Sequence, residues 1–339
     1  MTGVDTLVIV SCADSGELHT LRLDASGGLQ PQQVLAPGGQ LMPIALDPQR
    51  RHLWVARRSE PLAVIALAIA PDSGWLRLLG ETPLPASMAC LASDHSGRWL
   101  FSASYGADLI AVQAIRPDGL IAPEATIHPT GRHAHCIGAD PANRQVLASA
   151  LGADCLHRYH FDASSGQLTP AVPATIALPA GSGPRHFRFN ATGDRLYVLG
   201  ELDARLHVLA VAPDGTMALL QTVPTLPPDC SASPWAADLH LSPDGRHLYS
   251  CERNSSSLAG FAINAASGLL RLIGHWPTQS QPRGFAISAD SRWLVASGQT
   301  SHQISVHRID PDSGALTAGA VQAVGLNPNW VELLPIGAA

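Results

Sequence analysis

The sequence predicts an all-β fold: a seven-bladed β-propeller formed by residues 1–339 as a single domain. Three observations carry this prediction. One phrase recurs along the whole chain, each copy has room for four short strands, and the two ends of the chain hold complementary parts of one copy. Repeats of 20 to 50 residues are typical of solenoids and propellers, and four strands in about 45 residues match one propeller blade.

The recurring phrase is a turn of small and polar residues followed by a short apolar strand. It reads LDPQRRHLWVA, SDHSGRWLFSA, ADPANRQVLAS, NATGDRLYVL, SPDGRHLYSC and SADSRWLVAS. A seventh copy lies one step earlier, in LVIVS. The first apolar residues of these strands are separated by 46 to 52 residues and are Leu7, Leu53, Leu100, Val146, Leu196, Leu248 and Leu294. This regular period disfavours the alternative fold, an irregular β-sandwich.

Each full copy contains four strands in a fixed order. An inner strand such as MPIALDP comes first, and the strand of the recurring phrase is second. A third strand such as LAVIALAI leads through a PDSG turn to a fourth, WLRLLGE. Apolar–polar alternation between turns rich in glycine, aspartate and proline is the pattern of strands.

The ends of the chain predict how the ring closes. The first copy lacks an inner strand, whereas the C-terminal segment NPNWVELLP resembles an inner strand without a blade. We therefore expect the C-terminal strand to complete blade one. Such closure removes sheet edges that would otherwise pair with other chains.

Composition excludes several classes of function. Net charge is −6, and all 21 basic residues are arginine. The absence of lysine excludes Schiff-base chemistry and a P-loop. The sequence has no run of basic residues of the kind that binds nucleic acid, so a nucleic acid is not expected as a partner. We expect a monomer whose partner is a small molecule.

The cysteines and the N-terminal segment bear on location. Six cysteines occur without any C-x-x-C spacing, which disfavours a zinc or redox motif and favours a reducing compartment. The apolar run 7–10 is too short for a signal peptide or a membrane span. We therefore expect a cytoplasmic protein that does not associate with a membrane.

Candidate functional residues follow from aligning the copies at one mouth of the ring. The positions where inner strands begin hold Met42, Ala89, His135, Arg185, Ala237 and Arg283. The positions where second strands end hold Cys12, Arg58, Tyr105, Leu151, Glu201, Arg253 and Gln299. A structural role would repeat one residue, but these positions vary and are rich in ionisable side chains. Clustered arginines indicate an anionic ligand, because their guanidinium groups match carboxylate and phosphate.

Other polar residues have plainer interpretations. Arginines recur at one turn position, as in Arg144 and Arg246, which indicates a structural or solvated role. Asp238 and His240 are ligand candidates of second rank, since alternation places both on one side of a strand. A metal site is not expected, because only the pair His133 and His135 has suitable spacing and it lacks a third ligand.

Several longer segments carry a family resemblance that covers essentially the whole chain. They are GPRHFRFN, LGELDARLHVL, PWAADLHLSPDGRHLYSCER, TQSQPRGFAIS, SGQTSHQISVHRID and GLNPNW. The chain resembles the bacterial 6-phosphogluconolactonases of the propeller lactonase type. The superfamily also includes muconate-lactonising enzymes, and similarity to their active-site set points to His135, Arg185, Glu201 and Arg253.

The resemblance implies hydrolysis of 6-phospho-D-glucono-1,5-lactone to 6-phospho-D-gluconate, a step of the pentose phosphate pathway, without a metal or cofactor. Glu201 or His135 would be the general base, and Arg185 would stabilise the oxyanion. The remaining expected substrate-binding residues are Arg58, Arg253 and Arg283 at the phosphate, with Tyr105, Gln299, His302 and Trp330 lining the funnel. Open alternatives are another sugar-acid lactonase, a muconate-type cycloisomerase, or a non-catalytic binding platform.

Overall fold

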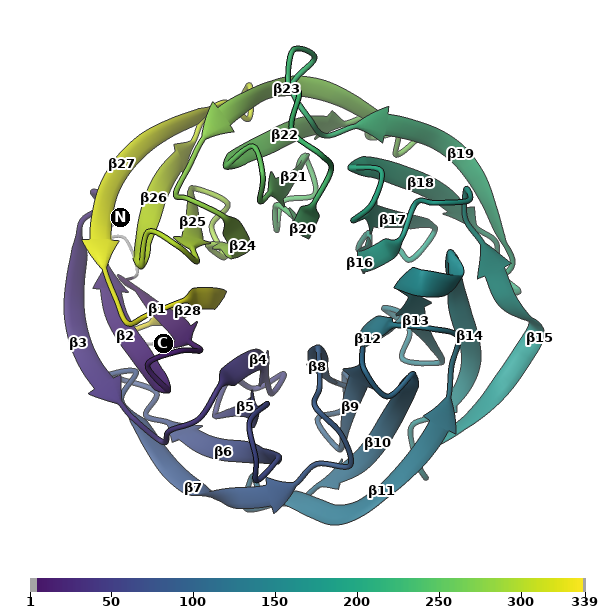
Figure 1. Ribbon diagram of the computed structural model, residues 1–339, viewed down its shortest axis with the longest axis horizontal. Coiled ribbons are helices and arrows are strands. Elements are labelled where there is room, and N and C mark those ends of the chain that lie inside the picture. The colour runs from purple at the N-terminus through teal and green to yellow at the C-terminus, as the bar shows by residue number, and fades with distance from the viewer. Residues whose placement is uncertain (1–4, 338–339) are drawn as a thin grey trace.

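The computed structural model describes residues 5–337, which form seven four-stranded antiparallel sheets around a central channel (Figure 1). Blade one consists of β28 (Pro328–Ile336), β1 (Asp5–Cys12), β2 (Glu17–Leu23) and β3 (Leu29–Leu35), from the channel outwards. The only helical element in the described residues is a 3-10 turn, η1 (Leu151–Ala153). No helix in that range is long and apolar enough to cross a membrane.

The other six blades each use four consecutive strands, again numbered from the channel outwards. They are β4 (Leu41–Leu46), β5 (His52–Arg57), β6 (Ala63–Ile69) and β7 (Leu76–Pro83); β8 (Cys90–Ser93), β9 (Trp99–Ser104), β10 (Leu109–Ile115) and β11 (Ile121–Pro129); β12 (Ala134–Ala139), β13 (Gln145–Ala150), β14 (Cys155–Asp162) and β15 (Gln167–Ala177); β16 (Pro184–Phe189), β17 (Arg195–Gly200), β18 (Arg205–Val211) and β19 (Met217–Pro224); β20 (Ala236–Leu241), β21 (His247–Glu252), β22 (Ser257–Ile263) and β23 (Leu270–Pro277); β24 (Pro282–Ile287), β25 (Trp293–Gly298), β26 (Gln303–Ile309) and β27 (Leu316–Ala323).

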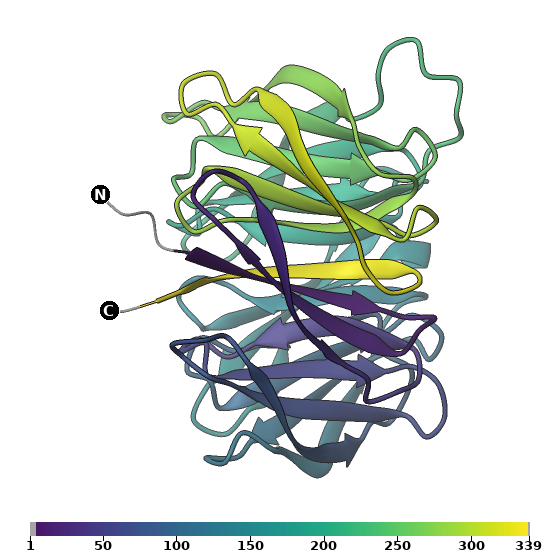
Figure 2. The same ribbon diagram turned by 90° about the vertical axis from the view of Figure 1, so that its left-hand side faces the viewer.

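The C-terminal strand closes the ring as predicted. β28 pairs antiparallel with β1, so that Val331 lies opposite Val10 and Leu334 opposite Leu7. Figure 2 shows β28 in yellow beside the purple strands of blade one. The predicted seven-bladed propeller, with blade one built from both ends of the chain, is confirmed.

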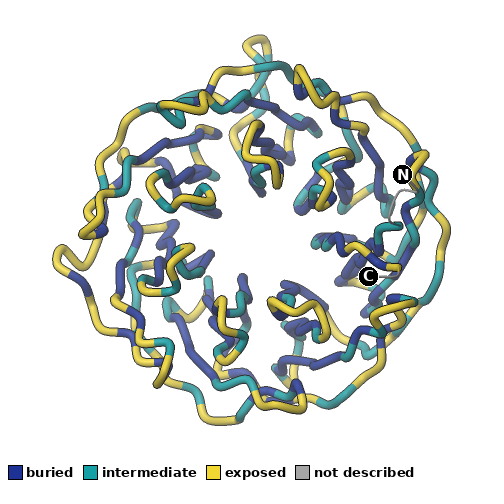
Figure 3. The backbone as a smooth tube through the Cα atoms, turned by 180° about the vertical axis from the view of Figure 1, so that it is seen from behind, coloured by how far each residue is buried: buried dark blue, intermediate teal, exposed yellow. Residues whose placement is uncertain are grey.

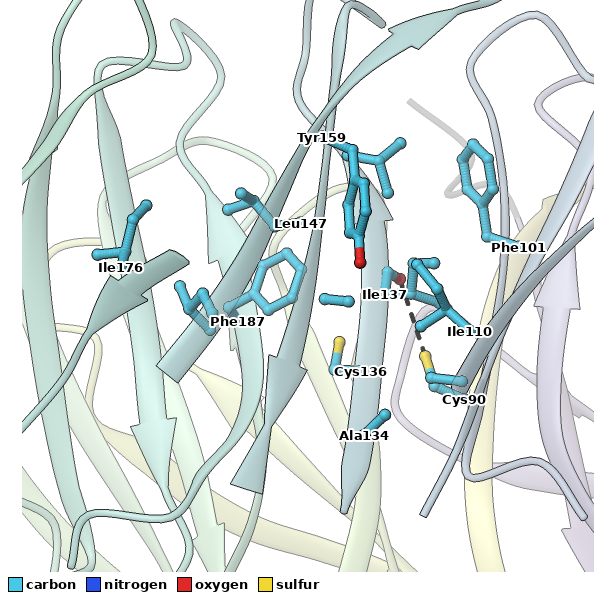
Figure 4. Close-up of a cluster of buried hydrophobic side chains, with 14 of the residues drawn as sticks. Cys90, Phe101, Ile110, Ala134, Cys136, Ile137, Leu147, Tyr159, Ile176 and Phe187 are labelled. Carbon is cyan, nitrogen blue, oxygen red and sulfur yellow. Dashed lines mark hydrogen bonds between the residues drawn. The ribbon is translucent and has the colours of Figure 1, made fainter. Parts of the chain in front are cut away.

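The core consists of apolar side chains packed between neighbouring blades. In the cluster of Figure 4, Phe101, Ile137, Leu147 and Phe187 come from blades three, four and five. Full burial of each such side chain stabilises the fold by about 1.5–3 kcal/mol. Figure 3 shows the consequence: strands near the channel are mostly buried, whereas the outermost strands are largely exposed.

Hydrogen bonds from buried aromatic tips also tie blade to blade. Trp54 Nε1 donates to the carbonyl oxygen of Gly119 at 2.8 Å, and Tyr249 OH donates to that of Gly314 at 2.7 Å. Each acceptor is a turn glycine of another blade, with φ of +84° and +72°. A buried tryptophan or tyrosine is satisfied in this way while its ring packs in the core.

A local irregularity shapes one mouth of the channel. In six blades the pairing between inner and second strand shifts register within the first residues of the inner strand. The shift falls at Arg185 in β16 and around His135 in β12. Such a bulge leaves a residue out of the ladder and redirects its side chain. The fold thus places non-repeating side chains around the channel mouth.

Candidate active site

A cavity of about 260 Å³ opens at this mouth. Its lining comes from the first residues of inner strands or the residue directly before them, and from residues that directly follow second strands. The lining residues are Arg58, Ala89, Tyr105, His135, Arg185, Glu201, Trp235, Arg253 and Arg283. A larger cavity of about 430 Å³, lined mainly by apolar and backbone groups, involves deeper residues of the channel wall such as Ile137, Phe187 and Trp330. We assign the site to the smaller cavity because the ionisable side chains converge there.

Glu201, the first residue after β17, joins two arginines. Its Oε2 lies 2.8 Å from Arg253 Nη2 and 2.9 Å from Arg185 Nε. The contact to Arg253 is a hydrogen bond, whereas Arg185 Nε is within ion-pair distance but lacks hydrogen-bond geometry. All three side chains are largely buried, and charge-assisted contacts in such surroundings fix their positions.

Arg253 is held on three further sides. Its Nε donates to the Trp235 carbonyl oxygen at 3.0 Å, and Nη2 donates to the Ala236 carbonyl oxygen at 3.1 Å. Its guanidinium carbon lies 3.9 Å from the centroid of the Trp235 ring, a cation–π contact. Burial and the charge of Arg185 lower the pKa of Arg253 to about 10, so it stays charged at neutral pH.

One guanidinium nitrogen of Arg185, Nη2, has no partner among the described residues. Nη1 donates to the Ala237 carbonyl oxygen and lies 3.2 Å from His186 Nε2, while Nε faces Glu201. Nη2 makes no hydrogen bond to any residue from 5 to 337. This nitrogen is therefore available to a ligand in the cavity.

His135 is buried, yet its Nδ1 has no hydrogen-bond partner within the described chain. Burial, together with the charges of Arg185, His186 and other cations, holds the pKa of His135 well below its usual value. The ring is therefore neutral at physiological pH, with a nitrogen able to accept a proton. Tyr105 meets it edge-on, with ring centroids 6.2 Å apart.

His133, the other histidine of the pair, does not line the cavity. Its ring stacks on Tyr105 at 4.2 Å, and its backbone N–H donates to Asp108 Oδ1 at 2.7 Å. In addition, no three His, Cys, Asp or Glu side chains in residues 5–337 are grouped to hold a metal ion.

Arg58 and Arg283 differ from the other two arginines. The guanidinium of Arg283 makes no hydrogen bond or ion pair within the described residues, and burial plus the charges of Arg185, Arg253 and Arg58 lower its pKa well below the usual value. Arg58 has only Ser87 Oγ at 3.1 Å and Met42 Sδ at 3.5 Å. Four guanidinium groups thus face one carboxylate, and this excess of positive charge suits an anion.

The structure brings together seven of the ten residues that the sequence put forward as site residues. Gln299, His302 and Trp330 do not line the cavity. Gln299 Nε2 donates to Asn327 Oδ1 at 2.7 Å, and His302 Nδ1 accepts from Asn327 N at 3.1 Å. Trp330 Nε1 donates to Glu332 Oε1 at 2.8 Å, and its ring borders the larger cavity. The first two join blade seven to the segment that closes the ring.

Sequence reasoning missed Trp235 and did not select Ala89. Trp235 lies just before β20, in the connection that follows β19, outside the strand positions that the copies share. The only feature of the sequence that could have identified Trp235 as a site residue is its position directly before an inner strand. Ala89 stood at a compared position but carries no reactive group.

Known proteins resemble this chain over nearly its full length. The family model described as "Lactonase, 7-bladed beta-propeller" matches residues 6–333. The 6-phosphogluconolactonase of Cronobacter sakazakii is 38% identical over 96% of this chain and 97% of its own. That of Sodalis glossinidius is 37% identical over 97% and 98%. The solved periplasmic gluconolactonase of Pseudomonas aeruginosa superposes with a TM-score of 0.87 at 28% identity, covering 97% and 99% of the two chains.

Proposed function

The chain belongs to the lactonase family of seven-bladed β-propellers, and on this premise we propose that it hydrolyses 6-phospho-D-glucono-1,5-lactone to 6-phospho-D-gluconate in the pentose phosphate pathway. The observation that carries the proposal is the cavity in which four arginines face a single carboxylate. A phosphorylated lactone supplies the missing negative charge and a carbonyl group for attack. Relatives that are 35–38% identical bear the name of this activity.

In the proposed reaction His135 is the general base. Its neutral imidazole ring, which lines the cavity, removes a proton from a water molecule, whose oxygen attacks the lactone carbonyl carbon. The carbonyl oxygen becomes negative and is stabilised by Arg185 Nη2. The bond to the ring oxygen then breaks, and that oxygen takes the proton back from His135. The product carboxylic acid ionises in water.

Glu201 is less suited to act as the base. Its Oε2 already accepts contacts from Arg185 and Arg253, so this oxygen is occupied. We propose that Glu201 instead orients both arginines. His135, in contrast, is neutral and has a free nitrogen.

The substrate's own charge strengthens the base. Burial comes first among the causes of the low pKa of His135, and three arginines contribute. A phosphate group bound beside Arg283 and Arg58 offsets part of this positive field. The pKa of His135 then rises toward neutrality, where general-base catalysis is most effective.

The proposal is tested by following acid release from 6-phosphogluconolactone and from unphosphorylated gluconolactone. We expect kcat/KM to be larger for the phosphorylated lactone, because only it reaches Arg283 and Arg58. A second candidate is gluconolactonase, favoured by the named activity of the Pseudomonas aeruginosa neighbour. A preference for the unphosphorylated lactone would select this candidate, and release no faster than spontaneous hydrolysis for either lactone would refute both.

We further propose that residues 1–339 act as one domain, as a monomer and in the cytoplasm. All six cysteines are free, and several of them lie in well-packed strands. Free thiols fit a reducing compartment. Cell fractionation tests the location, since a periplasmic pool would contradict it. Light scattering tests the monomer against an expected mass of 35.5 kDa.

A further inference from the structure

Behind Arg185 runs a chain of hydrogen-bonded side chains that the reaction above does not use. Arg185 Nη1 lies 3.2 Å from His186 Nε2, and His186 Nδ1 lies 2.7 Å from Asp238 Oδ1. Asp238 Oδ2 lies 3.0 Å from His240 Nε2. The chain crosses from β16 to β20, the inner strands of blades five and six. Arg185, His186 and Asp238 are all almost fully buried.

The order of donors and acceptors in this chain is fixed by Arg185. A guanidinium group only donates, so His186 Nε2 must accept. The ring hydrogen of His186 therefore sits on Nδ1 and is donated to Asp238. Burial and the charge of Arg185 lower the pKa of His186 to about 3, which keeps the ring neutral.

Asp238 is held as an ionised acceptor. Burial alone would raise its pKa, but His240, His186 and their hydrogen bonds hold the pKa well below its usual value. Its Oδ1 also accepts from the backbone N–H of Leu239 at 2.9 Å. Both oxygens are therefore engaged, and Asp238 cannot turn away from His186 without losing several contacts.

Arg185 would have a competing arrangement without this chain. Arginine–carboxylate pairs favour two parallel hydrogen bonds. Arg185 instead meets Glu201 through Nε alone, without hydrogen-bond geometry, while its Nη1 is held by His186 and Ala237. A side-on turn onto Glu201 would use Nη2, the nitrogen that has no partner among residues 5–337.

We propose that His186 and Asp238 are positioning residues that hold Arg185 so that its Nη2 remains directed at the lactone carbonyl. This inference rests on the proposed function and deepens it. His186 acts on Arg185, and Asp238 acts through His186 by fixing its tautomer and orientation. Neither residue touches the substrate, because neither lines the smaller cavity.

The kinetic test compares variants of His186 with a matched buried histidine. His186→Leu removes the acceptor, and we expect kcat to fall at least tenfold while KM changes less than twofold. His186→Gln restores an acceptor and should recover most of the lost kcat. Asp238→Leu should resemble His186→Leu, and the double variant should be no worse than either single one. Comparable losses in the Gln and Leu variants, or a rise in KM alone, contradict the proposal.

His307 provides the control for a merely structural role. It is buried in β26, its pKa is lowered by burial to about 4, and it hydrogen bonds to Ser305 at 3.1 Å. His307→Leu should lower the melting temperature as His186→Leu does but leave kcat unchanged. Equal loss of kcat in both would show that destabilisation, not positioning, explains the effect.

A second measurement does not depend on activity. In protein with ¹⁵N-labelled histidine, NMR should show His186 as the Nδ1–H tautomer, assigned by its disappearance in His186→Gln. The signal should change in Asp238→Leu. An Nε2–H tautomer overturns the proposal even if the lactone is hydrolysed. If wild-type protein hydrolyses no lactone but shows the Nδ1–H tautomer, the proposed function fails and the arrangement stands.

Discussion

Two walls of the same cavity use arginine in opposite ways. On the held wall, Arg185 and Arg253 are fixed by Glu201, by backbone carbonyls and by Trp235. On the open wall, Arg283 has no hydrogen-bond or ion-pair partner among the described residues, and Arg58 has only a hydroxyl and a sulfur. The difference teaches that residue type alone does not define a role at this site. The role of each arginine depends on the contacts that its guanidinium group makes with the protein.

The two walls suit two tasks. A group that stabilises a transition state must already be in place, because reorganisation during the reaction is costly. A group that binds a mobile anion can remain unpaired until the anion arrives. Without the anion, burial and the neighbouring arginines disfavour the charged form of such a group, which is why the pKa of Arg283 is lowered. We therefore propose that Arg185 stabilises the carbonyl oxygen, that Arg58 and Arg283 bind the phosphate, and that Arg253 supports the held wall.

The largest effect should follow from breaking the held wall. Arg185→Ala removes the nitrogen that we propose stabilises the carbonyl oxygen, so we expect kcat to fall about a hundredfold or more on both lactones. Steady-state kinetics with 6-phosphogluconolactone and gluconolactone measure this. Arg246→Ala, at an exposed turn, is the control and should match the wild type. A loss confined to the phosphorylated lactone would place Arg185 on the open wall instead.

Removing Arg283 should produce a smaller and selective effect. A charge-assisted hydrogen bond contributes about 1.5–3 kcal/mol, so Arg283→Ala should lower kcat/KM for 6-phosphogluconolactone about ten- to hundredfold. Gluconolactone never makes this contact, and its kcat/KM should change little.

Arg253→Ala sharpens the contrast between the walls. Because Arg253 supports Glu201, its loss should slow both lactones alike, by about tenfold. If Arg253→Ala is instead selective for the phosphorylated lactone, Arg253 binds phosphate and the division into two walls is wrong.

The repeat made much of this site predictable, but not the division between its walls. Aligning copies located His135, Arg185 and Glu201, because each blade presents equivalent positions at the mouth. The alignment could not show that Arg253 lies against Trp235, since this contact comes from a connection outside the repeat. Trp330 borders the larger cavity instead of the smaller one, and no count of strand positions reveals which cavity a side chain lines.

Strict alternation along a strand was also insufficient. It assumes an unbroken ladder, whereas the register shifts near the start of most inner strands. Arg185 and His186 are neighbours in sequence, yet their side chains contact each other at 3.2 Å. The shift recurs in six blades, so reading the inner strands as unbroken ladders misplaces side chains near the mouth.

The dependence of kcat/KM on pH should reveal how the arginines of the open wall affect the pKa of His135. As the proposed base, His135 would act in its neutral form, and its lowered pKa keeps that form present below pH 6.5. With gluconolactone, which carries no titrating phosphate, kcat/KM should vary less than about twofold between pH 7.5 and 6.5 and decline only in more acidic solution.

Arg283→Ala should shift this acid limb toward higher pH, because removal of a positive neighbour stabilises protonated His135 and raises its pKa. The shift is measured as the change in the midpoint of kcat/KM against pH. A wild-type midpoint at or above 6.5, or a shift of the variant in the opposite direction, would show that His135 is not the base.

The smallest expected effect is that of a chelator. Both walls present guanidinium groups, and Glu201, the only carboxylate from residues 5–337 that lines the cavity, is already shared by two of them. A divalent cation placed there would meet four like charges and no set of three ligands among the described residues. Prolonged dialysis against EDTA should therefore leave kcat/KM for both lactones unchanged, with the same protein dialysed into buffer alone as the control. Loss of activity that zinc or calcium restores would mean that the positive charge of the cavity is neutralised in some other way, and the contrast between held and open arginines would lose its basis.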